Sequence, residues 1–364
     1  MTVIKHDIDP DGDVEIVLKD HGKHQTIPEV RVRKGTEFPL AEAPVVGSPI
    51  LSDLVIPKDS AKNGDSQNKG GSDSNKEPIE IRIRVSSHQL SLVSPVFKKM
   101  LQGPFKEGTS PTSSSEPPIQ EISASDWNVH ALVIVLYIIH GRQHLAPQRV
   151  SLRFLVDVAV IVDYYDCANS VCLVVQLWDS LLPENQRNQS NTEFFILRLY
   201  ISWVFSLSES FSRMAAWYLR TGQGIDLVET YDLPVAAILA KLDLKRRAFI
   251  NEILTILNAI AKQHRLGKMT CKIFECRAMV YGSMQIGISE MKSANPLLDS
   301  PLYKGYSVAD VISLVKQFPH TNWRLLSQQS AHQCSVRSLM AQTFTNIEKG
   351  MGQSKLSDFQ HERS

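Results

Sequence analysis

The chain has 364 residues, 43% of them hydrophobic, so it is long enough for two ordinary domains and can bury a substantial core. Its 39 basic and 38 acidic residues nearly cancel, which excludes a global field that would draw it to nucleic acid or to an anionic membrane. Five irregularly spaced cysteines do not form a disulfide framework and favour a reducing compartment, cytoplasmic or nuclear. The longest apolar run, Ala131 to Ile139, is about half of the ~20 residues that a membrane-spanning helix requires, so we expect no membrane span.

The N-terminal part is expected to contain short strands and an insertion. Residues 1–10 are expected to form an N-terminal tail. Asp13 to Lys19 alternates over a short range, which predicts a half-buried strand, and Val30 and Val32 indicate another. From Lys58 to Glu77 the chain is polar apart from one alanine, so burial cannot offset the entropy of ordering. We expect a disordered insertion there.

A strand followed by a helix is predicted next. In Ile79 to Val85, apolar and charged residues alternate so strictly that only one face of a strand can be buried. Ser86 and Ser87 can cap a helix from His88 to Leu101, where apolar residues recur at three- and four-residue intervals. The pair Ser94-Pro95 inside this segment costs a backbone hydrogen bond, which predicts a short turn between two helical pieces.

Apolar patterns predict one more strand and three helices before the polar run that follows Pro183. These are a strand at Ile119 to Ser123 and helices at Trp127 to His140, Leu152 to Tyr165 and Val171 to Leu182. Ser125 or Asp126 is expected to cap the first helix, whose apolar residues surround the whole helix and so belong in a core. The second is rich in valine, as a strand would be, but its length and its breaks at Asp157 and Asp163 favour a buried helix.

The remainder, residues 190–350, is helical in character, and residues 351–364 are expected to be a disordered tail. The expected helices are Glu193 to Leu219, Val235 to Leu242, Arg246 to His264, a stretch around Cys271 to Ile288, and Val308 to Phe318. No fixed-period repeat is detectable, so a regular solenoid is not supported.

Residues 11–186 resemble a BTB/POZ domain, and are most similar to the large fungal group of BTB proteins. The resemblance rests on Asp13 to Leu18, Ile83 to Leu101, Tyr137 to Gly141 and Phe154 to Cys167, with Glu193 to Leu219 similar to the helical segment that usually follows. It implies an α+β fold in which a small sheet packs on a helical cluster, followed by an all-α region. In the family a tight hairpin connects the first two strands, whereas here about sixty residues lie between Lys19 and Ile79.

The resemblance implies a non-enzymatic scaffold or adaptor that binds proteins without a cofactor. Implied roles are self-association as a homodimer, presentation of clients to a cullin-type ubiquitin ligase, and transcriptional co-regulation. In the family, Leu90, Leu92 and Val93 fill the core, and Phe97 and Met100 lie near the self-association surface. The candidate interaction residues are His88, Leu90, Ser94, Pro95, Val96, Phe97 and Met100. A single histidine at a strand end, such as His88, is more often structural than catalytic.

Four side chains of types that zinc accepts are Cys271, Cys276, His332 and Cys334. Their spacing is not a standard one, and cysteines on helical sequence are often small buried apolar residues. The sequence favours this second interpretation, so no metal ligand is assigned. A zinc-stabilised helical receptor domain remains the alternative function.

Nucleic-acid binding and catalysis receive little support. The basic run Lys245 to Arg247 is typical of a solvated helix face, and no groove-reading helix or zinc-finger spacing accompanies it. The sequence contains no nucleophile elbow, phosphate-binding glycine loop or His-Glu-x-x-His motif. A degenerate enzyme is the weakest alternative, and it would require a concave pocket with perturbed titratable residues.

Overall fold

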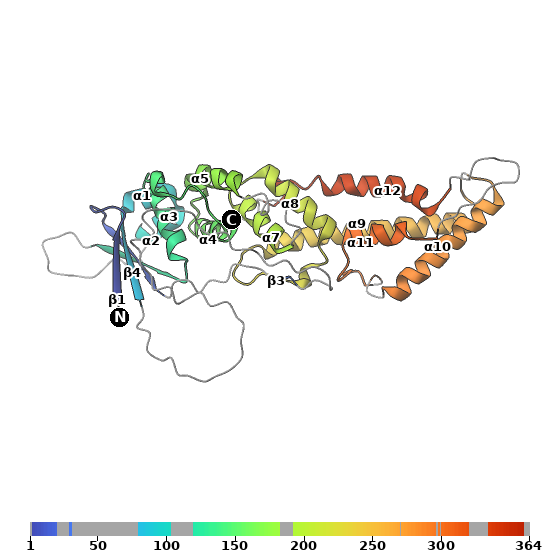
Figure 1. The fold of residues 1–364 in the computed structure, drawn as a ribbon, viewed down its shortest axis with the longest axis horizontal. Coiled ribbons are helices and arrows are strands. Elements are labelled where there is room, and N and C mark those ends of the chain that lie inside the picture. The colour runs from blue at the N-terminus through green and yellow to red at the C-terminus, as the bar shows by residue number, and fades with distance from the viewer. Residues whose placement is uncertain are drawn as a thin grey trace, which may run out of the picture. The chain divides into compact units, whose positions relative to one another are not determined.

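The computed structural model describes residues 2–19, 29–30, 79–102, 119–182, 192–269, 271–295, 298, 300–319 and 334–359. Over these residues the fold is mixed α+β, as predicted, with 11 helices and a small four-stranded sheet (Figure 1). The chain divides into two compact units. The first contains the four-stranded sheet and helices up to α5, and the second contains a two-stranded pair and the helices from α7 onward. The expected insertion at residues 58–77 lies outside the described residues.

The sheet of the first unit joins segments far apart in sequence. Its strands are β1 (Thr2–Asp7), β2 (Val14–Lys19), β4 (Ile79–Val85) and β5 (Gln120–Ser125). They lie in the order β1-β4-β2-β5, with β4 antiparallel to β2 and the two outer strands parallel to their neighbours. Val14 pairs with Val85 and Leu18 with Ile81, so β2 and β4 form a regular antiparallel pair although about sixty residues separate them.

Two predictions about these strands need correction. β2 was expected to be half-buried, but Ile16 and Val17, which point to opposite faces, are both buried. The reason is that β2 is a central strand and both of its faces are covered. Residues 1–10, expected to be a tail, contain the edge strand β1, whose side chains are exposed or half-buried.

Arg82 on β4 connects three strands through its guanidinium group. It donates hydrogen bonds to the carboxylates of Glu80, Glu15 and Glu121 at 2.7, 2.8 and 2.6 Å. These bonds, led by the one to Glu121, raise the pKa of Arg82 above its ordinary value. One cation therefore links β4 to β2 and β5 and stabilises their register.

The strand β4 leads into two short helices, α1 (Ser87–Val93) and α2 (Pro95–Gln102), as the Ser-Pro pair predicts. The Ser94 N–H donates to the Leu90 carbonyl at 3.1 Å, which closes α1. The Ser94 hydroxyl accepts from the Phe97 N–H at 2.9 Å, which caps α2, and Pro95 occupies a first-turn position that needs no donor. The same hydroxyl donates to the Tyr165 carbonyl at 2.5 Å. Ser94 therefore fixes the break and ties it to the core.

Three more helices complete the first unit: α3 (Val129–Ile139), α4 (Leu152–Tyr164) and α5 (Ala168–Leu181). Every residue of α3 except His130 is buried, which confirms its place in the core. Its cap is Asn128 rather than Ser125 or Asp126, because the Asn128 side chain accepts from the Ala131 N–H at 3.2 Å. The helical prediction for α4 is confirmed.

The second unit consists mainly of helices. They are α7 (Thr192–Val204), α8 (Ser208–Thr221), α9 (Ala236–Arg265), α10 (Phe274–Ala294), α11 (Val308–Lys316) and α12 (Val336–Met351). A two-residue strand pair, β3 (Glu29–Val30) with β6 (Val228–Glu229), belongs to the same unit. None of the described helices is both long and apolar enough to cross a membrane.

Several helix boundaries in this unit differ from the prediction. The single helix expected from Glu193 to Leu219 is broken where Ser206 adopts a φ of 55°, so α7 and α8 are separate. The two helices expected between Val235 and His264 are one continuous helix, α9. Helix α12 was not predicted.

The C-terminal tail is ordered as far as it is described. Leu356 and Phe359 are buried, and the Trp203 indole N–H donates to the Phe359 carbonyl at 3.4 Å. The expectation of a disordered tail is therefore wrong for residues 351–359, because apolar side chains attach this segment to the second unit. Residues 360–364 lie outside the description.

The basic run on α9 is not a solvated face at its centre. Arg246 is fully buried and pairs with the buried carboxylate of Asp243 at 2.7 Å. Its guanidinium also donates to the carbonyls of Leu302, Tyr303 and Tyr306, at 2.9, 3.1 and 2.5 Å. The prediction failed because Arg246 binds backbone carbonyls about sixty residues away, in the connection to α11.

Candidate metal centre

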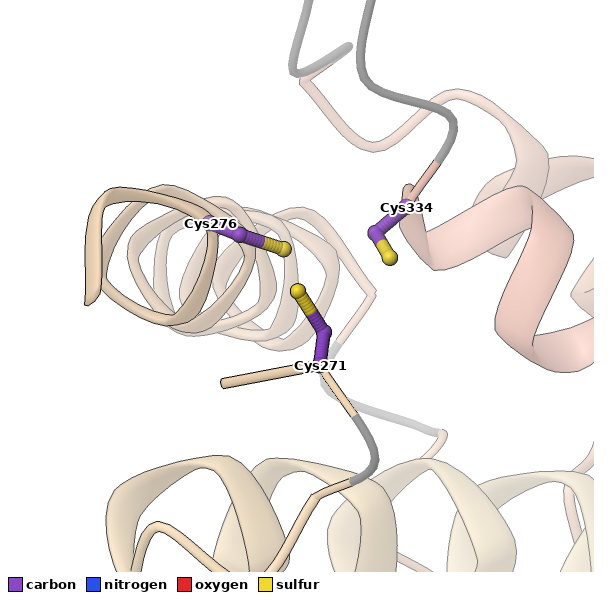
Figure 2. Close-up of side chains that lie close together, drawn as sticks. All are labelled: Cys271, Cys276 and Cys334. Carbon is purple, nitrogen blue, oxygen red and sulfur yellow. The ribbon is translucent and has the colours of Figure 1, made fainter. Parts of the chain in front are cut away.

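Three of the four predicted zinc-ligand candidates meet in the second unit. The sulfur atoms of Cys271, Cys276 and Cys334 all lie within 4.8 Å of one another, as thiols without a disulfide. Figure 2 shows the three side chains pointing toward a common centre from separate segments. The fourth candidate, His332, lies outside the described residues. The structure therefore brings together a set of ligands that sequence reasoning had considered and set aside.

The end of α9 directs the chain toward Cys271. Gly267 has a φ of 69°. Its N–H donates to the His264 carbonyl, and the N–H of Lys268 donates to the Gln263 carbonyl. This pair of bonds is a Schellman motif, which ends a helix and needs a residue in the left-handed region. A side chain on Gly267 would also approach the Arg277 guanidinium at 2.9 Å. The glycine thus determines where the chain leaves α9.

Cys276 lies in the first turn of α10 and is fully buried. It is the third residue of the helix, after Phe274 and Glu275. The first helical bond of this turn runs from the Arg277 N–H to the Ile273 carbonyl at 3.1 Å. N–H groups in a first helical turn lack intrahelical partners and favour a negative charge nearby. A thiolate at Cys276 is therefore better placed than one in the middle of a helix.

Cys334 lies directly before the cap residue of α12. The next residue, Ser335, caps the helix: its hydroxyl accepts from the Ser338 N–H at 3.2 Å, and the Ser338 hydroxyl accepts from the Ser335 N–H at 2.9 Å. Arg337 donates to the Lys316 carbonyl at 3.2 Å, which fixes the first turn of α12 against the end of α11. Apolar burial holds the rest of the helix, through Val336, Met340, Phe344, Ile347 and Met351.

The surroundings of the cluster disfavour ionisation of two of its thiols, Cys276 and Cys334. Burial, followed by hydrogen bonds with Cys271 and Cys334, raises the pKa of Cys276 to about 12. Burial also raises the pKa of Cys334. Packed thiols resist ionisation because each new thiolate would be close to the next. A thiophilic cation reverses this balance, since a coordinating thiol is deprotonated outright.

The other two cysteines have different surroundings. Cys167 is buried, its thiol approaches the Val162 carbonyl at 3.9 Å, and burial raises its pKa to about 12. Cys172 on α5 is partly exposed and donates to the Asn169 carbonyl at 3.3 Å. Both belong to the first unit and to no group of metal-ligand type among the described residues. Cys167 therefore packs in the core, whereas Cys172 is half-exposed.

The candidate interaction residues divide into buried and accessible side chains. Leu90, Ser94 and Phe97 are buried, and the Phe97 ring stacks on Tyr165 with centroids 4.1 Å apart. These three can influence a partner only through the shape of the α1–α2 hairpin. The accessible members are His88 and Pro95, which are exposed, and Val96 and Met100, which are half-buried. Leu92, expected in the core, is 71% exposed.

Sequence reasoning missed a row of exposed leucines on α5. Leu173, Leu177 and Leu181 are 77%, 54% and 38% exposed, and their spacing of four residues places them on one face of the helix. The prediction for this helix counted these leucines as packing residues. Val171, Val175 and Trp178 form the buried face of α5. Leu173 and Leu177 lie two residues after Val171 and Val175, which places them on a different face of the helix, and this spacing could have identified them.

A shallow pocket of about 250 Å³ lies between α8, α11 and α12. Arg220 and Glu348, which line it, form an exposed ion pair at 3.2 Å. The Nζ of Lys316 lies 5.4 Å from the ring centroid of Phe344. The charged groups are thus paired with neighbours rather than arranged around a reacting atom. This pocket gives the degenerate-enzyme alternative no support.

Comparison of the chain with family models, with curated proteins and with solved structures finds no match.

Proposed function

We propose that this chain is a non-enzymatic protein–protein interaction module, a BTB-type scaffold or adaptor. The observation that supports this best is the chain order of the first unit. Strands β2 and β4 pair directly, β4 leads into the α1–α2 hairpin, and β5, α3, α4 and α5 follow. This is the order that the resemblance implies, and the hairpin breaks at the same Ser94-Pro95 pair that contributes to the resemblance.

Apolar side chains are accessible at two places in the first unit, which supports a binding role. The hairpin surface consists of the exposed Leu92 with the half-buried Val96 and Met100, and the α5 surface consists of the exposed Leu173, Leu177 and Leu181. Grouped exposed leucines cost free energy in water and commonly mark sites where proteins bind. We assign the hairpin surface to a second copy of the chain, because the resemblance implies self-association through this part of the domain.

The full-length chain tests this assignment. Sedimentation velocity over a wide concentration range is expected to show a dimer. Leu92→Asp should convert the dimer to a monomer, since it places a charge in the apolar contact. Leu173→Asp is the matched control, because this leucine is as exposed as Leu92 but lies on α5, and the dimer should persist. Both substitutions are at exposed sites and should change stability by less than about 0.5 kcal/mol.

The opposite pattern would overturn the assignment. If Leu173→Asp dissociates the dimer and Leu92→Asp does not, self-association belongs to α5. A monomer at every concentration would overturn self-association itself. Among the implied partner classes, calorimetric titration with a purified cullin-type scaffold tests the ligase-adaptor role, and no binding would leave transcriptional co-regulation as the remaining class.

A further inference from the structure

The arrangement of the three cysteines is not explained by apolar packing. Packing accounts for Cys276, which is fully buried, but Cys271 and Cys334 are partly exposed. If these cysteines served only as apolar packing residues, turning a half-exposed sulfur toward two other sulfurs would bury little additional apolar surface. The three sulfurs nevertheless converge from the α9–α10 connection, the first turn of α10 and the residue before the cap of α12 (Figure 2).

A disulfide explains the convergence no better. A disulfide joins two sulfurs at about 2.05 Å and would leave the third as an odd thiol. A tetrahedral zinc site has Zn–S bonds of about 2.3 Å, which places its sulfurs about 3.8 Å apart. The observed limit of 4.8 Å is close to this spacing for all three pairs at once, so small side-chain rotations would complete the site.

We propose that Cys271, Cys276 and Cys334 bind one Zn²⁺ ion as three thiolates. Zinc is the chemical class that fits, because soft thiolate ligands in a tetrahedral arrangement select it over Mg²⁺ or Ca²⁺. The three thiolates fill three of the four positions, and an imidazole as the fourth ligand would give the Cys₃His set of structural zinc sites. The site does not depend on the interaction function proposed above, because all its ligands are in the second unit.

The role of the ion is structural. It connects the start of α10 with the start of α12, two helices whose cysteines are about sixty residues apart in sequence. Ligation closes a long loop, and the free energy of metal binding then adds to the stability of the folded unit. The first turns of α10 and α12 are therefore the segments that metal removal should loosen most.

The test uses the full-length protein, purified with a non-chelating reductant. Elemental analysis and native mass spectrometry should find about one zinc per chain. After removal of zinc, titration with Co²⁺ should produce intense thiolate-to-cobalt charge-transfer absorption and the visible bands of tetrahedral cobalt. Hydrogen exchange should become faster at residues 274–280 and 336–340 when the metal is removed, with little change in the first unit.

Cysteine variants locate the site. Cys334→Ser, at a half-exposed position, should weaken zinc binding by about 100-fold, since it removes one of three thiolates. Cys276→Ser should do the same, but its buried position makes it the variant more prone to misfold, so the Co²⁺ spectrum of the unmodified chain is the parallel measurement. Cys172→Ser is the matched control, a partly exposed cysteine in the first unit, and should leave zinc binding unchanged.

Three results would overturn the proposal. The first is reduced, folded protein that binds no stoichiometric zinc at micromolar concentrations. The second is zinc retained by a chain in which Cys271, Cys276 and Cys334 are all serine. The third is iron or copper in place of zinc in the purified protein. Failure of this test would not affect the dimer experiment, because Leu92→Asp acts on a different unit.

Discussion

The two units of this protein differ in the polar groups that they bury. Apolar side chains fill the core of both units, and in the first all but one residue of α3 are buried and both faces of β2 are covered. The second unit in addition contains a fully buried arginine at one point and three converging cysteines at another. Apolar burial tolerates changes of similar volume, whereas a buried charge or a ligand set tolerates almost none. The second unit should therefore be the more sensitive to single substitutions.

The largest effect is expected for Arg246→Ala. This change leaves the Asp243 carboxylate buried and removes a donor from three carbonyls of the connection to α11. Loss of one partner of a buried ion pair costs about 3–5 kcal/mol. Chemical unfolding of the full chain should show this loss, and hydrogen exchange should localise it to residues 300–319.

Arg247 provides the control, since it pairs with the same carboxylate at 2.5 Å while its side chain remains 27% exposed. Arg247→Ala should cost only about 1 kcal/mol, because water can replace a partly exposed partner. Arg246→Lys should remain unstable, because an ammonium cannot bind carboxylate and carbonyls in the fork geometry of guanidinium. Equal losses for the two alanine variants would contradict the role assigned to Arg246.

The sequence predicts the first unit well because its signals are local. The alternation of β4, the fully apolar α3 and the Ser94-Pro95 break each lie within a few residues. The structure confirms the strand, the buried helix and the break, although Glu80 on the charged face of β4 is also buried. The misses arise where partners are distant. The parallel pairing of β1 with β4 joins residues 2–7 to residues 79–84. The pattern within a six-residue segment cannot indicate which distant strand it pairs with.

The candidate site could be predicted in its ligand types but not in its geometry. Residue type made zinc an alternative, although the spacing is not a standard one and the packing interpretation was favoured. Cys334 joins Cys271 and Cys276 only through the packing of α12, which was not predicted. Arg246 was misjudged for the same reason, since charge alone suggests solvent and only the folded α10–α11 connection supplies its carbonyl partners. Contacts over about sixty residues depend on the tertiary fold and leave no local periodicity.

A smaller effect is expected for Ser94→Ala in the first unit. The change removes the cap of α2 and the hydrogen bond to the Tyr165 carbonyl, and leaves that buried carbonyl without this donor. The expected loss is about 1–3 kcal/mol. Unfolding monitored through exchange of residues 87–102 measures it. Ser91→Ala, in the adjoining helix α1, is the control and should be nearly neutral. If Ser91→Ala lost as much stability as Ser94→Ala, the loss could not be assigned to the cap.

The smallest effect is a pH dependence confined to the first unit. His140 accepts a hydrogen bond from the Ser86 N–H at its Nε2, at 3.0 Å, and its Nδ1 lies 2.8 Å from the Leu136 carbonyl, to which it donates as neutral imidazole. Burial, against weaker opposing effects of the Leu136 carbonyl and Asp9, lowers the pKa of His140 below its ordinary 6.5. A proton on Nε2 would remove the acceptor for the N–H of Ser86, the N-cap residue of α1.

Because the folded-state pKa of His140 is lowered, the unfolded chain binds the proton more readily, and stability must rise with pH. The contribution is complete above about pH 6.5 and is lost as the pH falls toward the lower, folded-state pKa. Burial also lowers the pKa of His130, which acts in the same direction, so the informative quantity is the difference between variants. Hydrogen exchange of residues 79–93 measures the loss of local stability between about pH 6.5 and pH 5, and His140→Gln should reduce this loss. His144→Gln, at an exposed position, should leave the loss unchanged. An unchanged loss in His140→Gln would show that the β4–α1 junction does not depend on this imidazole.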